Sequence, residues 1–286
     1  MKDHSADNER FLRILSFYLY SADKTVRADA FESVLSCGVD DDTAFALILA
    51  ESLGVDTERE WEFFASYFLP SVKRLCVSDY TDDEYYKAVR FAGESAGGAE
   101  LTYMTAAPLQ GFVRDDYLYF KDGRVVPRIG FFKEEYRYPA VLKDGLEWMT
   151  LLPNEINSQK KYIEAAHGNV LTYGLGLGYY AFHVARKPNV TSVTCVDTDG
   201  DIIALFEKNI LPAFPAEAAA KLKIIKADAF EFASGISDGT FDYIYADIWR
   251  DAGDGRELYL KFKSLEDRSP SSDFGYWIED TIKYYL

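Results

Sequence analysis

The first third of the chain has the hydrophobic spacing of α-helices. From residue 7 to about residue 92, apolar side chains recur every three or four positions, beginning with Phe11, Leu12, Leu15 and Tyr18. The same spacing predicts an aromatic-rich helix at residues 58–69 and a further helix from about residue 81 to residue 92. A run of small residues at 93–98 interrupts it. We therefore assign residues 1–98 to a helical N-terminal domain.

Beyond this break the hydrophobic period changes to two, which is the period of β-strands. Residues 117–120 and 125–126 flank an Asp-Gly turn, a pattern typical of a β-hairpin. A second Asp-Gly turn, Asp144-Gly145, separates residues 140–142 from residues 146–149. Residues 99–150 are therefore expected to form a small segment of β-hairpins.

Residues 151–286 alternate between helical and strand-like patterns. After a helix at 154–166, the predicted strands are 170–173, 193–196, 222–225 and 241–246, and the helices between them include 179–186 and 202–211. Such alternation builds a parallel sheet with helices on its faces, so the fold class is α/β with a Rossmann-like sheet. After residue 251 the pattern is mainly helical, with Phe274, Trp277, Ile278 and Ile282 at helical spacing. The sheet is then either shortened at its C-terminal side or completed by the preceding β-segment.

Composition narrows the classes of partner. The 286 residues carry a net charge of −16, with no run of Lys or Arg, and such a surface repels phosphate backbones, so we expect no nucleic-acid partner. No apolar run approaches the about 20 residues that a membrane-spanning helix needs. Three widely spaced cysteines form neither a metal-binding pattern nor a disulfide framework, which fits a reducing compartment. We expect a cytoplasmic protein without a metal site.

The most specific motif is a glycine-rich turn between a strand and a helix, which runs Tyr173-Gly174-Leu175-Gly176-Leu177-Gly178. Glycines suit a sharp bend whose backbone approaches a ligand closely. A dinucleotide fingerprint would need a third glycine at position 179, where this chain has tyrosine. The spacing favours instead a ligand whose sulfonium and amino-acid portion lies over the loop. A purely structural turn is the alternative.

Three carboxylates follow the predicted strands. Asp197 ends the second strand, about twenty residues after the loop, where it can accept hydrogen bonds from both hydroxyls of a ribose. Asp228 follows the third strand and can accept an exocyclic amine of adenine, with Phe230 packed nearby, and Asp247 closes the fourth strand. All three lie at carboxyl ends of parallel strands, where open α/β sheets bind ligands. Each could also be a helix cap, a turn residue or a solvated acid.

The order of these motifs resembles that of class I S-adenosylmethionine-dependent methyltransferases, and most closely their spermidine-synthase-like branch. The resemblance covers roughly residues 150–250 and implies binding of S-adenosylmethionine or its decarboxylated relative. It places the loop at the amino-acid end of that ligand, Asp197 at the ribose, Asp228 at the adenine and Asp247 at the reacting centre. The implied ligand-binding residues are Tyr173, Gly174, Gly176, Gly178, Asp197, Asp228, Ala229 and Asp247. In the related branch residues 154–159 line the mouth of the cofactor site, which makes Glu155 and Asn157 candidates beside their capping or surface roles.

Two departures from that branch bear on the activity. Its aminopropyltransferases carry an acid inside the glycine loop, which is absent here, and their Asp-Ser-Ser/Thr-Asp pattern after the fourth strand is replaced by residues 247–251. We therefore favour a methyltransferase with a small-molecule or protein acceptor, in which Asp247 and Glu155 orient or deprotonate the acceptor. The alternatives are a non-catalytic nucleoside-binding or scaffold protein, an aminopropyltransferase and a nicotinamide-dependent oxidoreductase. A homodimer is one option for the assembly.

Overall fold

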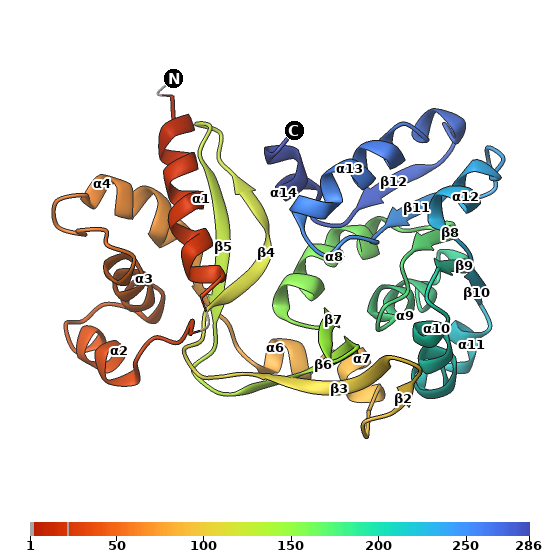
Figure 1. Cartoon of the computed structure of the whole chain (residues 1–286), viewed down its shortest axis with the longest axis horizontal. Helices are drawn as coiled ribbons and strands as arrows, with labels where there is room; N and C mark the ends of the chain where they lie inside the picture. The colour runs from red at the N-terminus through yellow and green to blue at the C-terminus, as the bar shows by residue number, and fades with distance from the viewer. Residues whose placement is uncertain (1–2, 22) are drawn as a thin grey trace. The chain divides into compact units, whose positions relative to one another are not determined.

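The computed structural model describes residues 3–21 and 23–286 (Figure 1). The chain forms two compact units, each built from two separate stretches of sequence. The first combines Met1–Tyr80 with Thr105–Arg137, and the second combines Thr81–Met104 with Tyr138–Leu286. The three-part division at residues 98 and 150 stays a prediction from sequence.

The first unit contains helices beside a three-stranded sheet. Its helices are α1 (Ser5–Leu19), α2 (Ala28–Leu35), α3 (Asp41–Ser52) and a continuous helical stretch made of α4 (Trp61–Phe63), the π-turn η1 (Phe64–Phe68) and α5 (Leu69–Ser71). Its strands are β1 (Val72–Arg74), β4 (Phe112–Tyr119) and β5 (Val125–Phe131), in the order β1-β5-β4. The predicted hairpin is confirmed, since β4 and β5 pair antiparallel around Gly123, whose φ is +94°.

An aromatic cluster forms the core of this unit. Phe131 is fully buried, lies stacked on Phe45 at 4.2 Å between ring centroids, and meets Phe31 edge-on at 5.9 Å. Offset and edge-on aromatic pairs of this kind add to the stabilisation that burial of their area already gives. Because Phe131 is the last residue of β5 while Phe31 and Phe45 lie on α2 and α3, this ring fixes both helices to the sheet.

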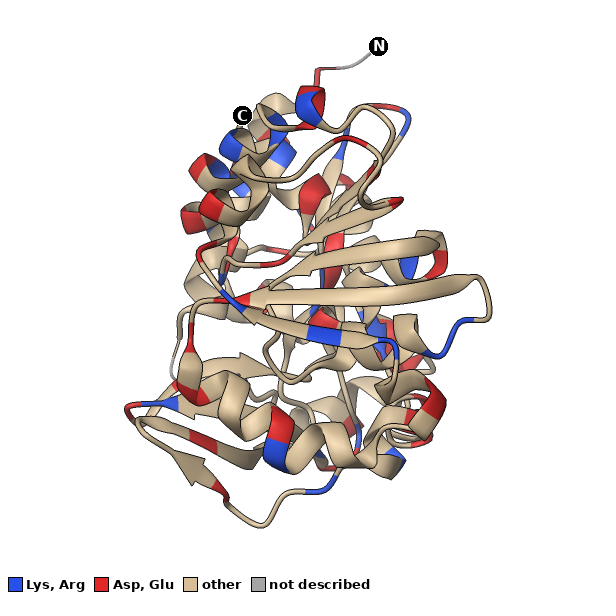
Figure 2. Cartoon of the chain, turned by 90° about the vertical axis from the view of Figure 1, so that its right-hand side faces the viewer, with Lys and Arg blue, Asp and Glu red and all other residues tan. Residues whose placement is uncertain are grey.

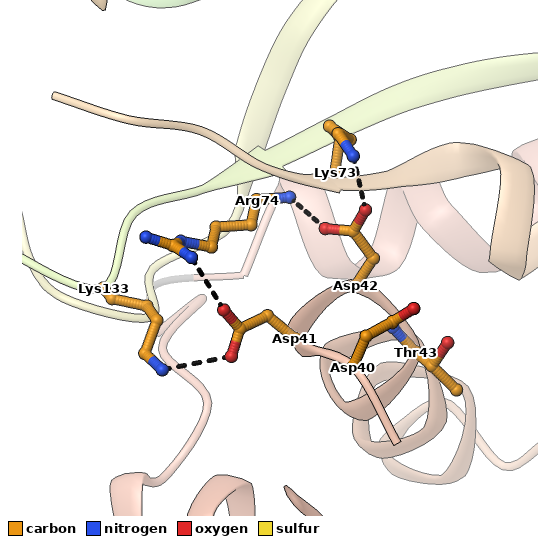
Figure 3. Close-up of polar contacts among 7 residues, drawn as sticks. All are labelled: Asp40, Asp41, Asp42, Thr43, Lys73, Arg74 and Lys133. Atoms are coloured by element: carbon orange, nitrogen blue, oxygen red, sulfur yellow. Dashed lines mark hydrogen bonds and ion pairs between the residues drawn. The ribbon is translucent and has the colours of Figure 1, made fainter. Parts of the chain in front are cut away.

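The N-terminus of α3 is tied to the same sheet by charged groups (Figure 3). Asp41 pairs with the Arg74 guanidinium and with Lys133, each at 3.0 Å. Asp42 pairs with Lys73 at 2.8 Å and accepts the Arg74 backbone N–H at 2.5 Å. Single exposed ion pairs contribute little, but carboxylates in the first turn of a helix are also favoured by the helix dipole. These contacts therefore set the position of α3 more than its stability.

The second unit holds the Rossmann-like sheet. Its strands are β8 (Gly168–Tyr173), β9 (Val190–Asp197), β10 (Leu222–Lys226), β11 (Tyr243–Ala246) and β12 (Asp273–Tyr276). All are parallel, in the order β10-β9-β8-β11-β12. The larger helices of this unit are α8 (Pro153–Ala165), α9 (Tyr179–Ala185), α10 (Gly200–Leu205), α12 (Ala229–Ser234) and α13 (Ala252–Lys263). The predicted α/β class is confirmed. The strand order reverses between β8 and β11, and ligands of open α/β sheets bind at such a reversal.

The remaining strands form a third sheet, in the order β2-β3-β6-β7. They are β2 (Ser95–Ala96), β3 (Ala99–Ala106), β6 (Tyr136–Lys143) and β7 (Leu146–Thr150). The second predicted hairpin is confirmed by the antiparallel pairing of β6 with β7 around Asp144 and Gly145.

Two predictions of helix need correction. The helix expected at 81–92 is present only as the short helix α7 (Glu84–Ala88), which follows the short helix α6 (Ser78–Thr81) and ends early because the chain becomes extended at Val89, with ψ 128°. The C-terminal segment after residue 271 contains the strand β12, which pairs with the open edge of β11 and is followed by the short helix α14 (Glu279–Tyr284). Pairing with β11 outweighs the local helical spacing, since it satisfies backbone groups at both ends of β12.

Figure 2 shows that Lys and Arg residues are scattered along the ribbon among Asp and Glu residues and do not form a broad basic surface in this view. The sequence holds 47 acidic and 31 basic residues. In the described part of the chain, no helix combines the length and the apolar character needed to cross a bilayer.

We expect the Phe131→Ala substitution to lower the free energy of unfolding by about 3–5 kcal/mol, because it removes a fully buried ring and leaves a cavity between two helices and a sheet. Denaturant unfolding followed by circular dichroism measures it. Phe17→Ala is the matched control, since Phe17 is 72% exposed and its loss is expected to stay within about 0.5 kcal/mol. Equal losses for the two variants would contradict the assigned core.

Candidate active site

Backbone hydrogen bonds bring the predicted site residues to one edge of the sheet. The Asp247 N–H donates to the Tyr173 carbonyl at 2.9 Å, and the Gly174 N–H donates to the Val196 carbonyl at 2.9 Å. The Ala227 N–H donates to the Asp197 carbonyl at 3.0 Å. The glycine loop and the three strand-end carboxylates therefore follow four adjacent parallel strands at their carboxyl ends.

The three loop glycines all have positive φ values, +94° at Gly174, +49° at Gly176 and +72° at Gly178. A β-carbon at Gly174 would overlap the Asp247 carbonyl oxygen, and one at Gly178 would overlap the Phe206 ring. One at Gly176 would overlap the sulfur of Met149. Conformation therefore favours glycine at all three positions, and space also requires it at Gly174 and Gly178, before any ligand is considered.

Asp197 holds the loop from the neighbouring strand. One of its carboxylate oxygens accepts the Leu175 N–H at 2.9 Å, and the other accepts the Asp199 N–H at 2.8 Å. The side chain is half-buried, and each carboxylate oxygen has a further lone pair. The predicted ribose contact stays a prediction, and loop support is the role that the contacts of Asp197 show directly.

Asp228 is the N-cap of α12. Its carboxylate accepts the N–H groups of Phe230 and Glu231, each at 2.9 Å, and its side chain is exposed. The ring of Phe230 contacts Phe262 at 4.5 Å between centroids, while Ala229 is buried. Asp228 is thus a helix cap at the carboxyl end of β10, and contact with an adenine stays a prediction.

Only the backbone of Tyr173 takes part in this edge of the sheet, where its carbonyl accepts the Asp247 N–H, and its ring lies in the core. The ring is 1% exposed and contacts Phe262 at 5.0 Å.

The chemically unusual part of the site is a pair of carboxyl groups, Glu155 on α8 and Asp247 after β11. Gln159, one helical turn after Glu155 and 1% exposed, donates to Asp247 at 3.3 Å and also hydrogen bonds to Glu155. The Tyr245 hydroxyl donates to Asp247 at 3.4 Å. The two acids are therefore linked through one amide and lie beside the loop, because Gly174 contacts the Asp247 carbonyl.

Burial raises the pKa of both acids. The pKa of Asp247 rises from 3.8 to about 7, mainly because its charged form loses hydration, and the Tyr245 hydrogen bond opposes this only in part. The pKa of Glu155 is raised well above its usual value by burial first and then by the charges of Asp247 and Glu147. Two nearby carboxyl groups do not ionise together easily, so the protonated form of Glu155 is favoured, while Asp247, with a pKa of about 7, changes protonation near neutral pH. A carboxylate with a pKa near 7 is suited to accept a proton from a substrate.

Three buried polar atoms on α8 and α9, the helices on either side of the loop strand in sequence, have no protein partner among the described residues. They are the side-chain carbonyl oxygens of Asn154 and Gln159 and the hydroxyl oxygen of Tyr180. The Tyr180 ring is stacked on Tyr245 at 4.2 Å, which places it against the strand that leads to Asp247. Buried unpaired groups are costly and rare. The two carbonyl oxygens would be satisfied by a ligand that offers N–H or O–H donors.

The sequence did not identify Gln159, Tyr180 or Tyr245. The spacing of Gln159 four residues after Glu155, on one face of a helix, was an available signal. The two tyrosines carried no such signal, because tyrosine is found in hydrophobic cores as often as in functional sites. Asn157, by contrast, accepts from Lys160 at 2.9 Å on α8.

Two surface grooves of the same unit lie elsewhere. One of about 470 Å³ is lined by β10 and α12, including Lys223, Phe232 and Phe241. Another of about 340 Å³ is lined by residues of α7 and α9, including Phe182 and Arg186. None of the predicted site residues lines either groove. On chemical grounds we therefore regard the carboxyl pair, and not either groove, as the candidate active site.

Comparison with known proteins agrees with this architecture. Residues 156–266, less than half of the chain, match the family model of the spermine/spermidine synthase domain. This region resembles a spermine/spermidine synthase domain. The matched residues include the loop, Asp197, Asp228 and Asp247, but not Glu155. No curated protein sequence gives a significant match.

Three solved structures are similar over part of their lengths. They are a precorrin 8w decarboxylase from Methanobacterium thermoautotrophicum (20% identity, 38% of this chain, 52% of that chain, TM-score 0.28), the spermidine synthase from Thermotoga maritima (17%, 43%, 48%, 0.33) and a conserved hypothetical protein from Streptococcus pyogenes (16%, 36%, 60%, 0.30). The matched regions span about half of those chains, from 48% to 60%.

We expect Gly174→Ala to destabilise the protein by about 1–3 kcal/mol more than Gly239→Ala, because both positions have positive φ but only Gly174 contacts a backbone carbonyl that cannot move aside. Denaturant unfolding of both variants measures the difference. Gly239 has open space around it and therefore reports the conformational cost alone. Equal losses would show that the loop does not contact Asp247.

The raised pKa of Asp247 makes stability pH-dependent. Because the folded protein holds this proton more tightly than the unfolded chain, we expect its stabilising effect to be complete below about pH 4 and to be lost as pH rises through about 7. Asp247→Asn should weaken this fall in unfolding free energy between pH 5 and pH 8. Asp267→Asn, at an exposed position, is the control. The same slope in wild type and D247N would contradict a raised pKa at Asp247.

Proposed function

We propose that this chain is a transferase that moves a methyl group from S-adenosylmethionine to a small-molecule nucleophile bearing an N–H or O–H group. The observation that carries the proposal is the half-buried pair Glu155 and Asp247, linked by Gln159 and adjacent to the glycine loop. The resemblance to a spermine/spermidine synthase domain supports an S-adenosyl donor, and the strand order supports its location.

The fit of such a donor rests on the shape and chemistry of the loop edge. The positive φ values of Gly174, Gly176 and Gly178 let the backbone turn sharply at the carboxyl end of β8, the edge of the sheet where an S-adenosyl ligand would bind. Asp197 and Asp228 offer carboxylate acceptors on the two neighbouring strands. A bound S-adenosyl sulfonium supplies an already activated carbon, so the protein needs to provide alignment and exclusion of water more than covalent chemistry.

The role of the acid pair is to handle the acceptor. The unpaired carbonyl oxygens of Asn154 and Gln159 accept hydrogen bonds from the acceptor group and orient its lone pair. As that lone pair forms the bond to the methyl carbon, the carbon–sulfur bond breaks and its electrons return to sulfur. The acceptor proton passes to Asp247, which with a pKa of about 7 is a competent general base near neutral pH. The raised pKa of Glu155 favours its protonated form, which limits the negative charge beside Asp247.

A second candidate is transfer of an aminopropyl group from decarboxylated S-adenosylmethionine. The match to the spermine/spermidine synthase domain favours it, and the same acid pair could deprotonate an amine. The loop lacks the acid typical of that chemistry, so methyl transfer ranks first. A non-catalytic nucleoside-binding protein and a nicotinamide-dependent oxidoreductase are the remaining alternatives.

Calorimetric titration with S-adenosylmethionine, S-adenosylhomocysteine and NADH tests the donor. We expect saturable binding of the two S-adenosyl ligands and none of NADH. We expect Asp247→Asn to retain S-adenosylhomocysteine binding but to lower turnover by about 10²–10⁴-fold, since general-base catalysis contributes this much. Turnover should also rise with pH through about 7, the pKa of the base.

Asp267→Asn is the control for this experiment, and we expect it to behave like wild type because the residue is exposed and distant in sequence from the loop and the acid pair. Absence of binding of either S-adenosyl ligand at millimolar concentration would end the proposal. Binding without release of a methylated or aminopropylated product from any of a library of small amines and alcohols would favour the non-catalytic alternative.

A further inference from the structure

The side chain of Met149 lies on the glycine loop. Met149 belongs to β7, and its sulfur accepts the Leu177 N–H at 3.1 Å while lying directly against Gly176. Neither the family-model match at 156–266 nor the loop motif includes this residue. The thioether therefore occupies space that the loop leaves open at its second glycine.

The Leu177 N–H binds a weaker acceptor than the N–H groups of Gly174, Leu175 and Gly178 do. The N–H groups of Gly174 and Gly178 donate to backbone carbonyls of the same fold, and that of Leu175 donates to Asp197. The Leu177 N–H donates only to a thioether, which is a weak acceptor. It lies between Gly176 and Gly178, which both have positive φ values.

Met149 is the first residue of β7 after the hairpin turn that is not exposed. Leu146, Glu147 and Trp148 are all exposed, whereas Met149 is partly buried and its sulfur contacts the loop. Because methionine has three rotatable side-chain bonds, its sulfur can leave the loop without movement of the strand.

We propose that Met149 is a specificity-determining residue, which competes with the α-carboxylate of an S-adenosyl ligand for the Leu177 N–H. This inference rests on the proposed S-adenosyl site and concerns the amino-acid end of the ligand only. Ligands that keep the adenosine and the sulfur but lack the amino-acid portion do not meet this competition. Met149 therefore lowers the affinity for carboxylate-bearing ligands relative to carboxylate-free ones.

The test compares S-adenosylhomocysteine with 5′-methylthioadenosine, which share the adenosine and the thioether and differ in the amino-acid portion. Calorimetry gives both dissociation constants for wild type and Met149→Ala. We expect the substitution to raise the affinity for S-adenosylhomocysteine by about tenfold, because its carboxylate then gains a hydrogen bond from the Leu177 N–H. The affinity for 5′-methylthioadenosine should change by less than about twofold.

Two further variants sharpen the comparison. Met149→Leu keeps an apolar side chain of similar volume but removes the sulfur acceptor, and we expect a smaller preference change in the same direction, about threefold. Met104→Ala removes a partly exposed methionine from β3, in the same sheet, and should leave both affinities unchanged. Circular dichroism tests whether each variant is folded. If M149A does not fold, the affinities of M149L decide whether Met149 sets the specificity.

An unchanged affinity ratio in M149A, or in M149L where only that variant folds, would overturn the role of Met149 and leave the proposed function intact. Equal tightening of both ligands would also overturn it, because Met149 would then obstruct the nucleoside rather than the carboxylate. Binding of neither ligand to any variant would overturn this inference together with the proposed function.

Discussion

The structure of the site depends on the parallel pairing of β8 with β9 on one side and β11 on the other. Val170 and Leu171 are fully buried, so the strand is enclosed on both faces and its register is fixed by packing as well as by hydrogen bonds. Tyr173 pairs with Val196 and with Ala246 in this register. A shift of one residue would separate Gly174 from Asp247 and would turn Asp197 away from the loop that it supports.

The glycine loop and the acid pair differ in what they reveal about function. Gly174 and Gly178 are required by packing against the Asp247 carbonyl and Phe206, so the motif would be needed even in a protein that bound nothing. The acid pair has no such structural reason. Burial of two carboxyl groups raises their pKa values and costs stability, and this cost is typical of sites where chemistry is performed. The functional argument therefore rests on Glu155 and Asp247 more than on the glycines.

Support for the loop comes from segments outside the matched domain. The buried Tyr85 hydroxyl, from α7, donates to the Leu177 carbonyl at 2.5 Å, and the Met149 sulfur accepts the N–H of the same residue. Asp83, the N-cap of α7, contacts both Tyr179 and His183 of α9 at 3.1 and 3.2 Å. The segments that precede the Rossmann-like sheet in the chain thus hold the loop and the helix that follows it from outside the sheet.

The sequence alone determined the α/β class, both hairpins and the position of the loop and acids after successive strands, because these depend on local hydrophobic period and turn chemistry. It did not determine β12, since the local spacing of residues 274–282 fits a helix and only the free edge of β11 selects a strand. It also could not show that Gln159 links Glu155 to Asp247, or that Met149 lies on Gly176. Those contacts join elements far apart in the chain, and their energies depend on burial that exists only once the sheet has formed.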